Sequence, residues 1–333
     1  MMGFLSSERA RAAVRWIILV VAVCAVIGAM LGLAIARTPV ERTVAVIVVP
    51  HPDDEFQAWS LIEERAAEYT VFVSLTRGEE TGFCEDEART GGLQPDLGER
   101  VPDPLPHGRW TPECAQAREG SLLGYLTQMA MADPSIPGDF APPARYGPLP
   151  ADGTDVCRID DAVKHCPEEL REVQVWLDRG DRGAVVFFDL GDGDLTEAEA
   201  IWAIQAVLDH RADWGMDAGY PVGSLIGAFA NDSWPCYSYP HPDHLAVHSA
   251  LWNVDFGSGP QIGATCFLDP RQRMSAIVSG ASAEASFARA ADQTRLGAHG
   301  VHYGWLHGEV YPLSGVLQNT LFMRFQSFWI RFN

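Results

Sequence analysis

The sequence contains very little lysine and no closely spaced cysteine pair. Lys164 is the only lysine among 333 residues, and 44 Asp and Glu side chains outnumber 24 Lys and Arg side chains. The formal net charge of −20 argues against a nucleic-acid partner, because binding to phosphate backbones requires basic patches. The absence of a Cys-x-x-Cys motif argues against a structural zinc site built from cysteines.

One stretch near the N-terminus has no charged residue. Residues 16–36, WIILVVAVCAVIGAMLGLAIA, are apolar over about the ~20 residues that a helix needs to cross a bilayer. The arginines before this stretch favour a cytoplasmic location for that end. We therefore predict a cytoplasmic N-terminus over residues 1–15, a transmembrane signal anchor over residues 16–36, and a domain outside the cytoplasm. The small residues before Arg37 leave a cleaved signal peptide, and hence a secreted protein, as the alternative.

The remaining cysteines fit an exported domain. Six of them follow the apolar stretch, and an even number in an exported protein is typical of disulfide bonds. We expect Cys157 and Cys166 to pair with each other, because both lie in one loop-like region. The sequence does not choose among the other pairings, and free buried thiols are the alternative. The six residues are Cys84, Cys114, Cys157, Cys166, Cys236 and Cys266.

Alternating strand and helix patterns predict an α/β fold with a mostly parallel sheet. The run TVAVIVV at residues 43–49 is β-branched without alternation, which is typical of a strand buried on both faces. The domain is predicted over residues 43–333, with a loop-rich insertion at about 84–165. Further strands are expected at residues 69–76, 184–190 and 222–230 and in the apolar tail; helices are expected at residues 55–68, 112–130, 170–180 and 195–211 and from Pro242.

Two polar clusters follow the first and fourth of these expected strands. In parallel sheets, ligands gather beyond the carboxyl ends of the strands, so both clusters are expected at one rim. A catalytic zinc ion needs three nitrogen or oxygen ligands and one open position, and a nearby carboxylate and imidazole then serve as base and acid. The first cluster holds His51, Asp53, Asp54 and Glu55, and the second holds Tyr239, His241, Asp243 and His244.

Other metal-like patterns are weaker. His248 lies four residues after His244, but we expect it to be a packed histidine. The three histidines between residues 299 and 307 lie in a glycine-containing segment, and we expect a loop there. The acidic run at residues 189–199 lacks the spacing of a calcium loop. Four tryptophans are candidates for stacking on sugar rings, although buried packing is the expected role of each: Trp110, Trp214, Trp234 and Trp305.

The order of the motifs resembles the LmbE/PIG-L family of zinc-dependent N-acetylglucosaminyl deacetylases. PHPDDE is followed by a predicted helix, a strand and TRGEETG, and HPDH comes much later. The resemblance covers roughly residues 44–252; it is specific at the two clusters and loose between them. It implies a Rossmann-like three-layer fold, which agrees with the pattern of strands and helices.

The resemblance also implies a role for each cluster residue. His51, Asp54 and His244 match the ligands of Zn²⁺, with Fe²⁺ as the alternative metal. The remaining matches are Asp53 as general base, His241 as the imidazole that assists the leaving amine, Asp243 as the residue that orients His241, and Tyr239 as a group that polarises the carbonyl. Arg118 and Glu119 resemble the family's Arg/Glu helix start, but with a different spacing, and Glu80 resembles an acid that contacts the sugar or supports the site.

The sequence therefore predicts a membrane-anchored or secreted metal-dependent amide hydrolase. Its expected substrate is an N-acetylated amino sugar in an envelope glycan or glycolipid. One alternative is hydrolysis of a different N-acyl amide, and another is a non-catalytic, metal-containing carbohydrate-binding protein. Asp53 and His241 count against the last alternative, because a binding module needs neither an acid nor a base. The sequence identifies no protein partner.

Overall fold

The computed structural model describes most of the chain after residue 41. The chain divides into two units, Met1–Glu41 and Arg42–Asn333. Among the described residues no helix has the length and apolar character required to cross a membrane. The predicted anchor at residues 16–36 lies outside the described residues except for three valines. The described residues are 42–64, 68–85, 105–160, 162–216, 219–231, 239–265, 273–289, 296–298 and 325–332, with Val20, Val21 and Val23.

The described residues of the second unit form a nine-stranded sheet in the order β10-β13-β9-β8-β1-β2-β7-β6-β3. Its centre, from β9 to β7, is parallel, and the strands beyond both ends of that centre pair antiparallel. The bounds are β1 Thr43–Val49, β2 Glu68–Thr76, β3 Ala144–Tyr146, β6 Val173–Leu177, β7 Gly183–Leu190, β8 Val222–Phe229, β9 Gln261–Thr265, β10 Arg273–Ile277 and β13 Phe325–Arg331.

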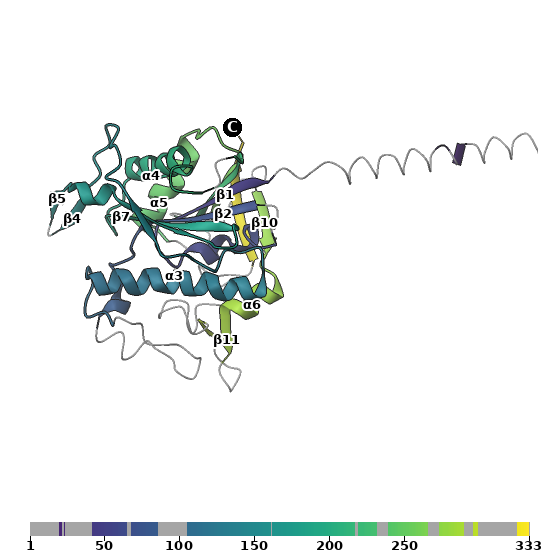
Figure 1. Ribbon diagram of the computed structural model, residues 1–333, viewed down its shortest axis with the longest axis horizontal. Coiled ribbons are helices and arrows are strands. Elements are labelled where there is room, and N and C mark those ends of the chain that lie inside the picture. Colours follow the sequence, from purple (N-terminus) through teal and green to yellow (C-terminus); the bar gives the residue numbers. More distant parts are fainter. Residues whose placement is uncertain are drawn as a thin grey trace, which may run out of the picture. The chain divides into compact units, whose positions relative to one another are not determined.

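Helices cover both faces of this sheet (Figure 1). One core lies against α4 (Glu197–His210) and α5 (Pro242–Asn253). The other lies against the 3₁₀ helix η1 (Glu55–Leu61) and α3 (Pro112–Ala132), with α6 (Gly280–Ser286) beside α3. Alternate residues of β1 enter different cores, which explains why its sequence is apolar without alternation.

Most of the predicted elements are confirmed, and one was wrong. Residues 170–180 were expected to be a helix, but they form a short 3₁₀ helix, η4 (Glu168–Arg171), and then the strand β6. Val173 and Val175 pack in one core and Trp176 in the other, which is the two-residue period of a strand. The helix expected at residues 55–68 is the shorter η1. The capping box at the start of α4 is present.

The predicted insertion is more ordered than its composition suggested. It contains the 21-residue α3 and a hairpin of β4 (Arg158–Asp160) and β5 (Val163–His165).

A second small hairpin lies outside the insertion. It consists of β11 (Phe287–Arg289) and β12 (Leu296–Ala298) and follows α6.

Two disulfide bonds lie in or at the ends of the insertion at about residues 84–165. The expected Cys157–Cys166 bond is confirmed, and a Cys84–Cys114 bond joins the short 3₁₀ helix η2 (Gly82–Cys84) to the first turn of α3. Cys236 and Cys266 lie outside the described residues.

Asp178, which directly follows β6, joins the segment after α3 to the sheet, and its removal should destabilise the fold. Its carboxylate accepts the backbone N–H groups of Gly138 and Asp139 and two bonds from the Arg182 side chain. Burial raises the pKa of Asp178, but these donors outweigh burial and lower the pKa to about 2. We expect Asp178→Asn to lower the free energy of unfolding by about 1–3 kcal/mol in urea titrations at pH 7.

The same pKa gives the pH dependence of this effect. Because the folded pKa lies below the ordinary value of 3.8, the carboxylate stabilises the fold above that value and loses its contribution as the pH falls towards 2. The difference between wild type and variant should therefore shrink below about pH 4. A difference that is absent at pH 7, or that grows in acid, would contradict this role for Asp178.

Candidate metal centre

The two predicted polar clusters meet at the carboxyl ends of neighbouring strands. His51 lies in the bend after β1, and His244 lies in the first turn of α5, which follows β8. Strands β1 and β8 pair in parallel, so the segments that leave them start at the same edge of the sheet. Pro242 occupies the first turn of α5, where its missing N–H costs no hydrogen bond.

The side chains of His51, Asp54 and His244 converge at this edge. One ligand atom from each lies within 4.8 Å of the others. Asp54 Oδ2 is 3.0 Å from His51 Nδ1 and 3.3 Å from His244 Nε2. Ligand atoms of a tetrahedral zinc ion, with bonds of about 2.0–2.1 Å, lie about 3.3 Å apart. All three residues are buried. The described residues therefore include a donor set that could hold a metal ion.

The hydrogen bonds of His244 give independent support for a cation. Its Nδ1–H donates to the carbonyl oxygen of Phe229 over 2.5 Å. In the tautomer that this bond selects, Nε2 carries a lone pair, and among the described residues it has no hydrogen-bond partner although it is buried. Because Nε2 faces a carboxylate oxygen of Asp54, two electron-pair donors are held together. A metal ion bound between these two atoms would accept both lone pairs and remove their repulsion.

The other two candidate ligands, His51 and Asp54, are also oriented by hydrogen-bonding partners outside the donor set. His51 Nε2 lies 3.0 Å from carboxylate oxygens of both Asp192 and Asp243. Gln57 donates from Nε2 to Asp54 Oδ1 over 2.6 Å and accepts the backbone N–H of Phe229. Such outer partners fix the orientation of metal ligands and tune their basicity. Gln57 and Asp192 are parts of the site that the sequence analysis missed.

The electrostatics of this cluster reflect its many carboxylates. Burial lowers the pKa of His51, but Asp192, Asp243 and Asp54 outweigh it and hold that pKa well above its ordinary value. Burial raises the pKa of Asp54, but His244 and His51 outweigh it and hold that pKa well below its ordinary value. Three buried carboxylates thus surround one imidazole, which favours a bound cation.

Asp53 lies beside the donor set and contacts a residue of the insertion. Its Oδ1 is 2.9 Å from a guanidinium nitrogen of Arg118, a buried residue of α3. This ion pair holds the Asp53 carboxylate in one orientation. Arg118 was identified in the sequence only as part of a loosely matching helix start, and the structure places it at the site.

His241 and Tyr239 complete the rim of the site. The His241 ring centroid lies 4.8 Å from that of His51 and 5.4 Å from that of His244. The Tyr239 ring packs against both His241 and His244, with centroids 5.7 and 4.8 Å away. Burial and the neighbouring His51 lower the pKa of His241. A neutral imidazole and a phenol therefore border the metal centre on one side.

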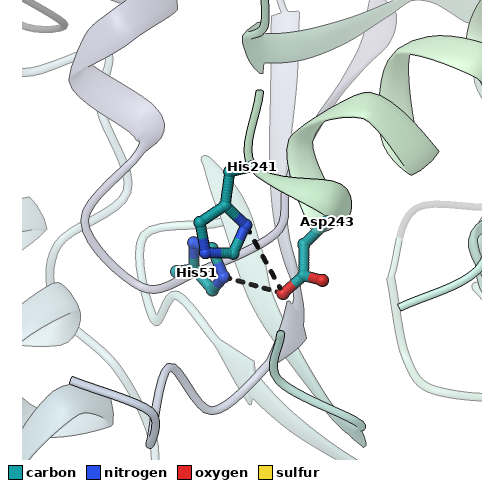
Figure 2. Close-up of side chains that lie close together, drawn as sticks. All are labelled: His51, His241 and Asp243. Atoms are coloured by element: carbon teal, nitrogen blue, oxygen red, sulfur yellow. Dashed lines mark hydrogen bonds and ion pairs between the residues drawn. The ribbon is translucent and has the colours of Figure 1, made fainter. Parts of the chain in front are cut away.

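Asp243 lies closer to His51 than to His241, its expected partner. Its Oδ2 lies 3.0 Å from His51 Nε2 but 4.0 Å from His241 Nδ1, beyond hydrogen-bond distance (Figure 2). The carboxylate is fully buried and also accepts the backbone N–H groups of Gly193 and Leu195. Asp243 therefore contacts the candidate ligand His51 directly, in addition to its longer approach to His241, the partner that the resemblance implied.

The structure also decides between two readings of His248. Its Nε2–H donates to the carbonyl oxygen of Ala228, and its Nδ1 accepts the indole N–H of Trp329. Burial lowers the pKa of His248 to about 4. With both ring nitrogens occupied, His248 is a packed, neutral histidine, as expected. The histidines between residues 299 and 307 lie outside the described residues.

Comparisons of the chain with models of known protein families, with curated protein sequences and with solved structures find no significant match.

Proposed function

We propose that this protein is a metal-dependent amide hydrolase that removes the acetyl group from an N-acetylated amino sugar. The observation that carries the proposal is the grouping of a metal-binding donor set with a carboxylate and an imidazole at one edge of the sheet. His51, Asp54 and His244 form the donor set, and Asp53 and His241 lie beside it. Amide hydrolysis needs these three functions: activation of water, a base and an acid.

In the proposed reaction, each residue of the site has a separate role in amide hydrolysis. A bound Zn²⁺, or alternatively Fe²⁺, would supply a Lewis acid that activates water and polarises the amide carbonyl. Asp53 accepts the proton of the attacking water, and the Arg118 guanidinium keeps its carboxylate in place. His241 and Tyr239 face the developing oxyanion, and His241 assists departure of the amine.

The substrate class rests on the resemblance of PHPDDE and HPDH to the LmbE/PIG-L deacetylases. The Rossmann-like arrangement implied by that resemblance agrees with a parallel sheet covered on both faces. We further propose that the domain works outside the cytoplasm, anchored by residues 16–36 or secreted. Two disulfide bonds support this location, because such bonds persist in oxidising compartments. An envelope glycan or glycolipid is then the natural substrate.

Acetate release tests this proposal. We would purify the full-length chain in mild detergent, load it with Zn²⁺ or Fe²⁺, and offer it a panel of N-acetylglucosamine sugars and glycolipids. We expect acetate to be released by the metal-loaded protein and not after treatment with a chelator. Release of a different acyl group would point to another N-acyl amide as substrate. Metal binding without any hydrolysis would favour a carbohydrate-binding protein.

A further inference from the structure

A large cavity lies beside the metal centre, and none of the three candidate ligands lines it. Its volume is about 1200 Å³. This exceeds the range of about 300–1,000 Å³ that is typical for small-molecule pockets. One wall is the first half of α3, and another is the β4 strand of the small hairpin. The segment that follows β7 forms part of the remainder. A single N-acetylated sugar at the metal would leave this cavity unfilled.

The cavity and the metal centre share part of their walls. Asp192 lines the cavity, and its Oδ1 lies 3.0 Å from His51 Nε2. On α3, Glu119 lines the cavity, while the adjacent Arg118 contacts Asp53. A ligand that reaches the metal centre can therefore extend into the cavity without leaving the protein surface.

Trp110 stands at the rim of the cavity in an unusual conformation. Its side chain is 54% exposed and lines the cavity, and its φ angle of +59° is uncommon for a bulky residue. The surrounding structure holds it there. Trp110 N–H donates to the carbonyl oxygen of Glu79, and the preceding turn is joined to Cys84 by a backbone bond from Gly108. Strained, exposed residues of this kind cluster at ligand sites.

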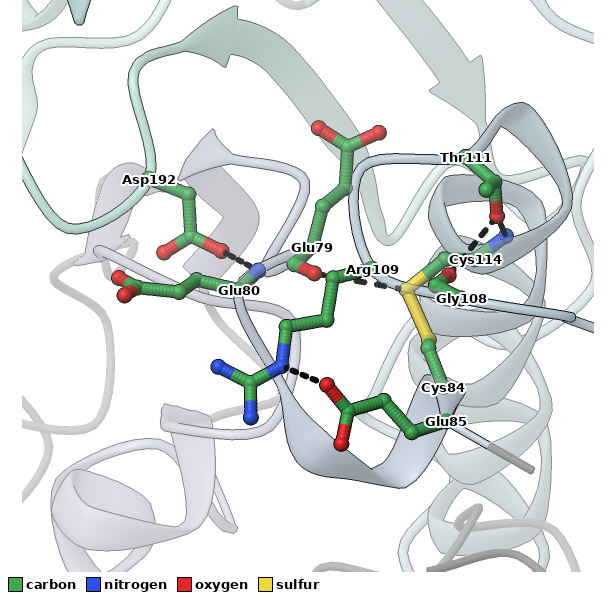
Figure 3. The surroundings of a disulfide bond; sticks show 9 residues. All are labelled: Glu79, Glu80, Cys84, Glu85, Gly108, Arg109, Thr111, Cys114 and Asp192. Carbon is green, nitrogen blue, oxygen red and sulfur yellow. Dashed lines mark hydrogen bonds and ion pairs between the residues drawn. A yellow bond between two sulfur atoms is a disulfide. The ribbon is translucent and has the colours of Figure 1, made fainter. Parts of the chain in front are cut away.

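Both of the described disulfides hold walls of this cavity. The Cys84–Cys114 bond links the segment after β2 to the first turn of α3 (Figure 3), four residues after Trp110 in the sequence. The Cys157–Cys166 bond closes the base of the hairpin, whose Ile159 also lines the cavity. Walls that are fixed before binding lower the entropic cost of holding a ligand.

The charges in the cavity indicate the chemistry of its ligand. Six carboxylates and three guanidinium groups line it, and Arg77 is already paired with Glu119. This excess of negative charge disfavours phosphate and uronic-acid groups. Burial, together with the charge of Asp189, raises the pKa of Glu79 to about 7. Near neutral pH, Glu79 can therefore donate a hydrogen bond to a hydroxyl group or accept one from an amine.

We propose that this cavity is a second sugar subsite, and that the substrate is a glycan in which an uncharged or amine-bearing sugar follows the N-acetylated sugar at the metal. Trp110 stacks on the apolar face of that second ring, and the carboxylates bind its hydroxyl or amino groups. The inference rests on the proposed function and deepens it, because it names the length and charge of the substrate.

Binding measurements separate this inference from the proposed reaction. We would use full-length, metal-loaded protein carrying Asp53→Asn, which keeps the ligand intact, and titrate it by calorimetry with N-acetylglucosamine and with its disaccharide. We expect the disaccharide to bind about 10-fold or more tightly than the monosaccharide, and Trp110→Ala to abolish that preference. Trp252→Ala is the matched control, because Trp252 is 43% exposed and does not line the cavity.

The outcomes are distinct. Equal affinities for the two sugars, no binding of the disaccharide at millimolar concentration, or a preference that survives in Trp110→Ala would each overturn the subsite. Acetate release by the metal-loaded wild-type protein, which retains Asp53, tests the proposed reaction separately. If neither sugar yields acetate but the disaccharide preference depends on Trp110, the reaction is wrong and the subsite stands.

Discussion

Replacing Asp53 with asparagine should lower the rate of acetate release by about 10²–10⁴-fold, the range that a positioned general base contributes. Asparagine has nearly the same shape and still accepts a hydrogen bond from Arg118, but it cannot take a proton from water. Asp53 is not one of the grouped donor residues. We therefore expect the variant to bind one metal ion per chain, like the wild type.

The measurement compares kcat for acetate release with metal content determined by mass spectrometry on the same samples. Asp213→Asn is the matched control, because the Asp213 side chain is 79% exposed and its ion pair is with His210, which is not a residue of the candidate site. Its kcat should equal that of the wild type. An Asp53→Asn variant that keeps more than a tenth of the wild-type rate would rule out Asp53 as the base. Loss of metal in that variant would instead move Asp53 into the ligand set.

Replacing His244 with alanine should have the largest effect on metal binding. The change removes the buried Nε2 that faces Asp54 and leaves two of the three candidate ligands. We expect the affinity for Zn²⁺ to fall more than 100-fold, beyond the roughly 10–100-fold that loss of an outer-shell partner costs. Competition with a chromophoric chelator measures the affinity, and circular dichroism checks that the variant is folded.

Two further variants make this test specific. His248→Ala removes a partly buried histidine one turn further along α5, and it should leave metal affinity unchanged because both ring nitrogens of His248 already have partners. Asp192→Asn changes a carboxylate behind His51 and should weaken binding by about 10–100-fold. If His244→Ala and His248→Ala bind Zn²⁺ equally well, the assigned ligand set is wrong.

Much of the fold could be predicted because its signals are local. The β-branched run of β1 required burial on both faces, and the capping box at Thr196 and Glu199 marked the start of α4. Prediction failed at β6, because its run of five residues is too short for a two-residue period to be distinguished from a helix pattern. Its strand conformation depends on antiparallel pairing with β7, a partner that residues 170–180 do not contain.

In the candidate site, too, some residues could be predicted from local motifs and others could not. His51, Asp54 and His244 could be selected from two short motifs, because each motif follows a strand and carries residue types that bind metals. Asp192 could not be selected, because an acidic turn after a strand is usually only a solvated loop. The acid-rich sequence DLGDGDL was its one signal, and it did not indicate that His51 would be the neighbour.

By itself, the sequence determined the strands β1, β2, β7 and β8 of the parallel centre but not β9, the residue types available for metal chemistry, and the local Cys157–Cys166 bond. Only the tertiary structure decided that Asp243 contacts His51, that Arg118 reaches Asp53, and that Trp110 lines a cavity. The reason is physical. Local patterns specify backbone conformation over a few residues, whereas contacts between segments 50 to 200 residues apart depend on how the sheet brings its strand ends together, as in the 192-residue separation between His51 and Asp243.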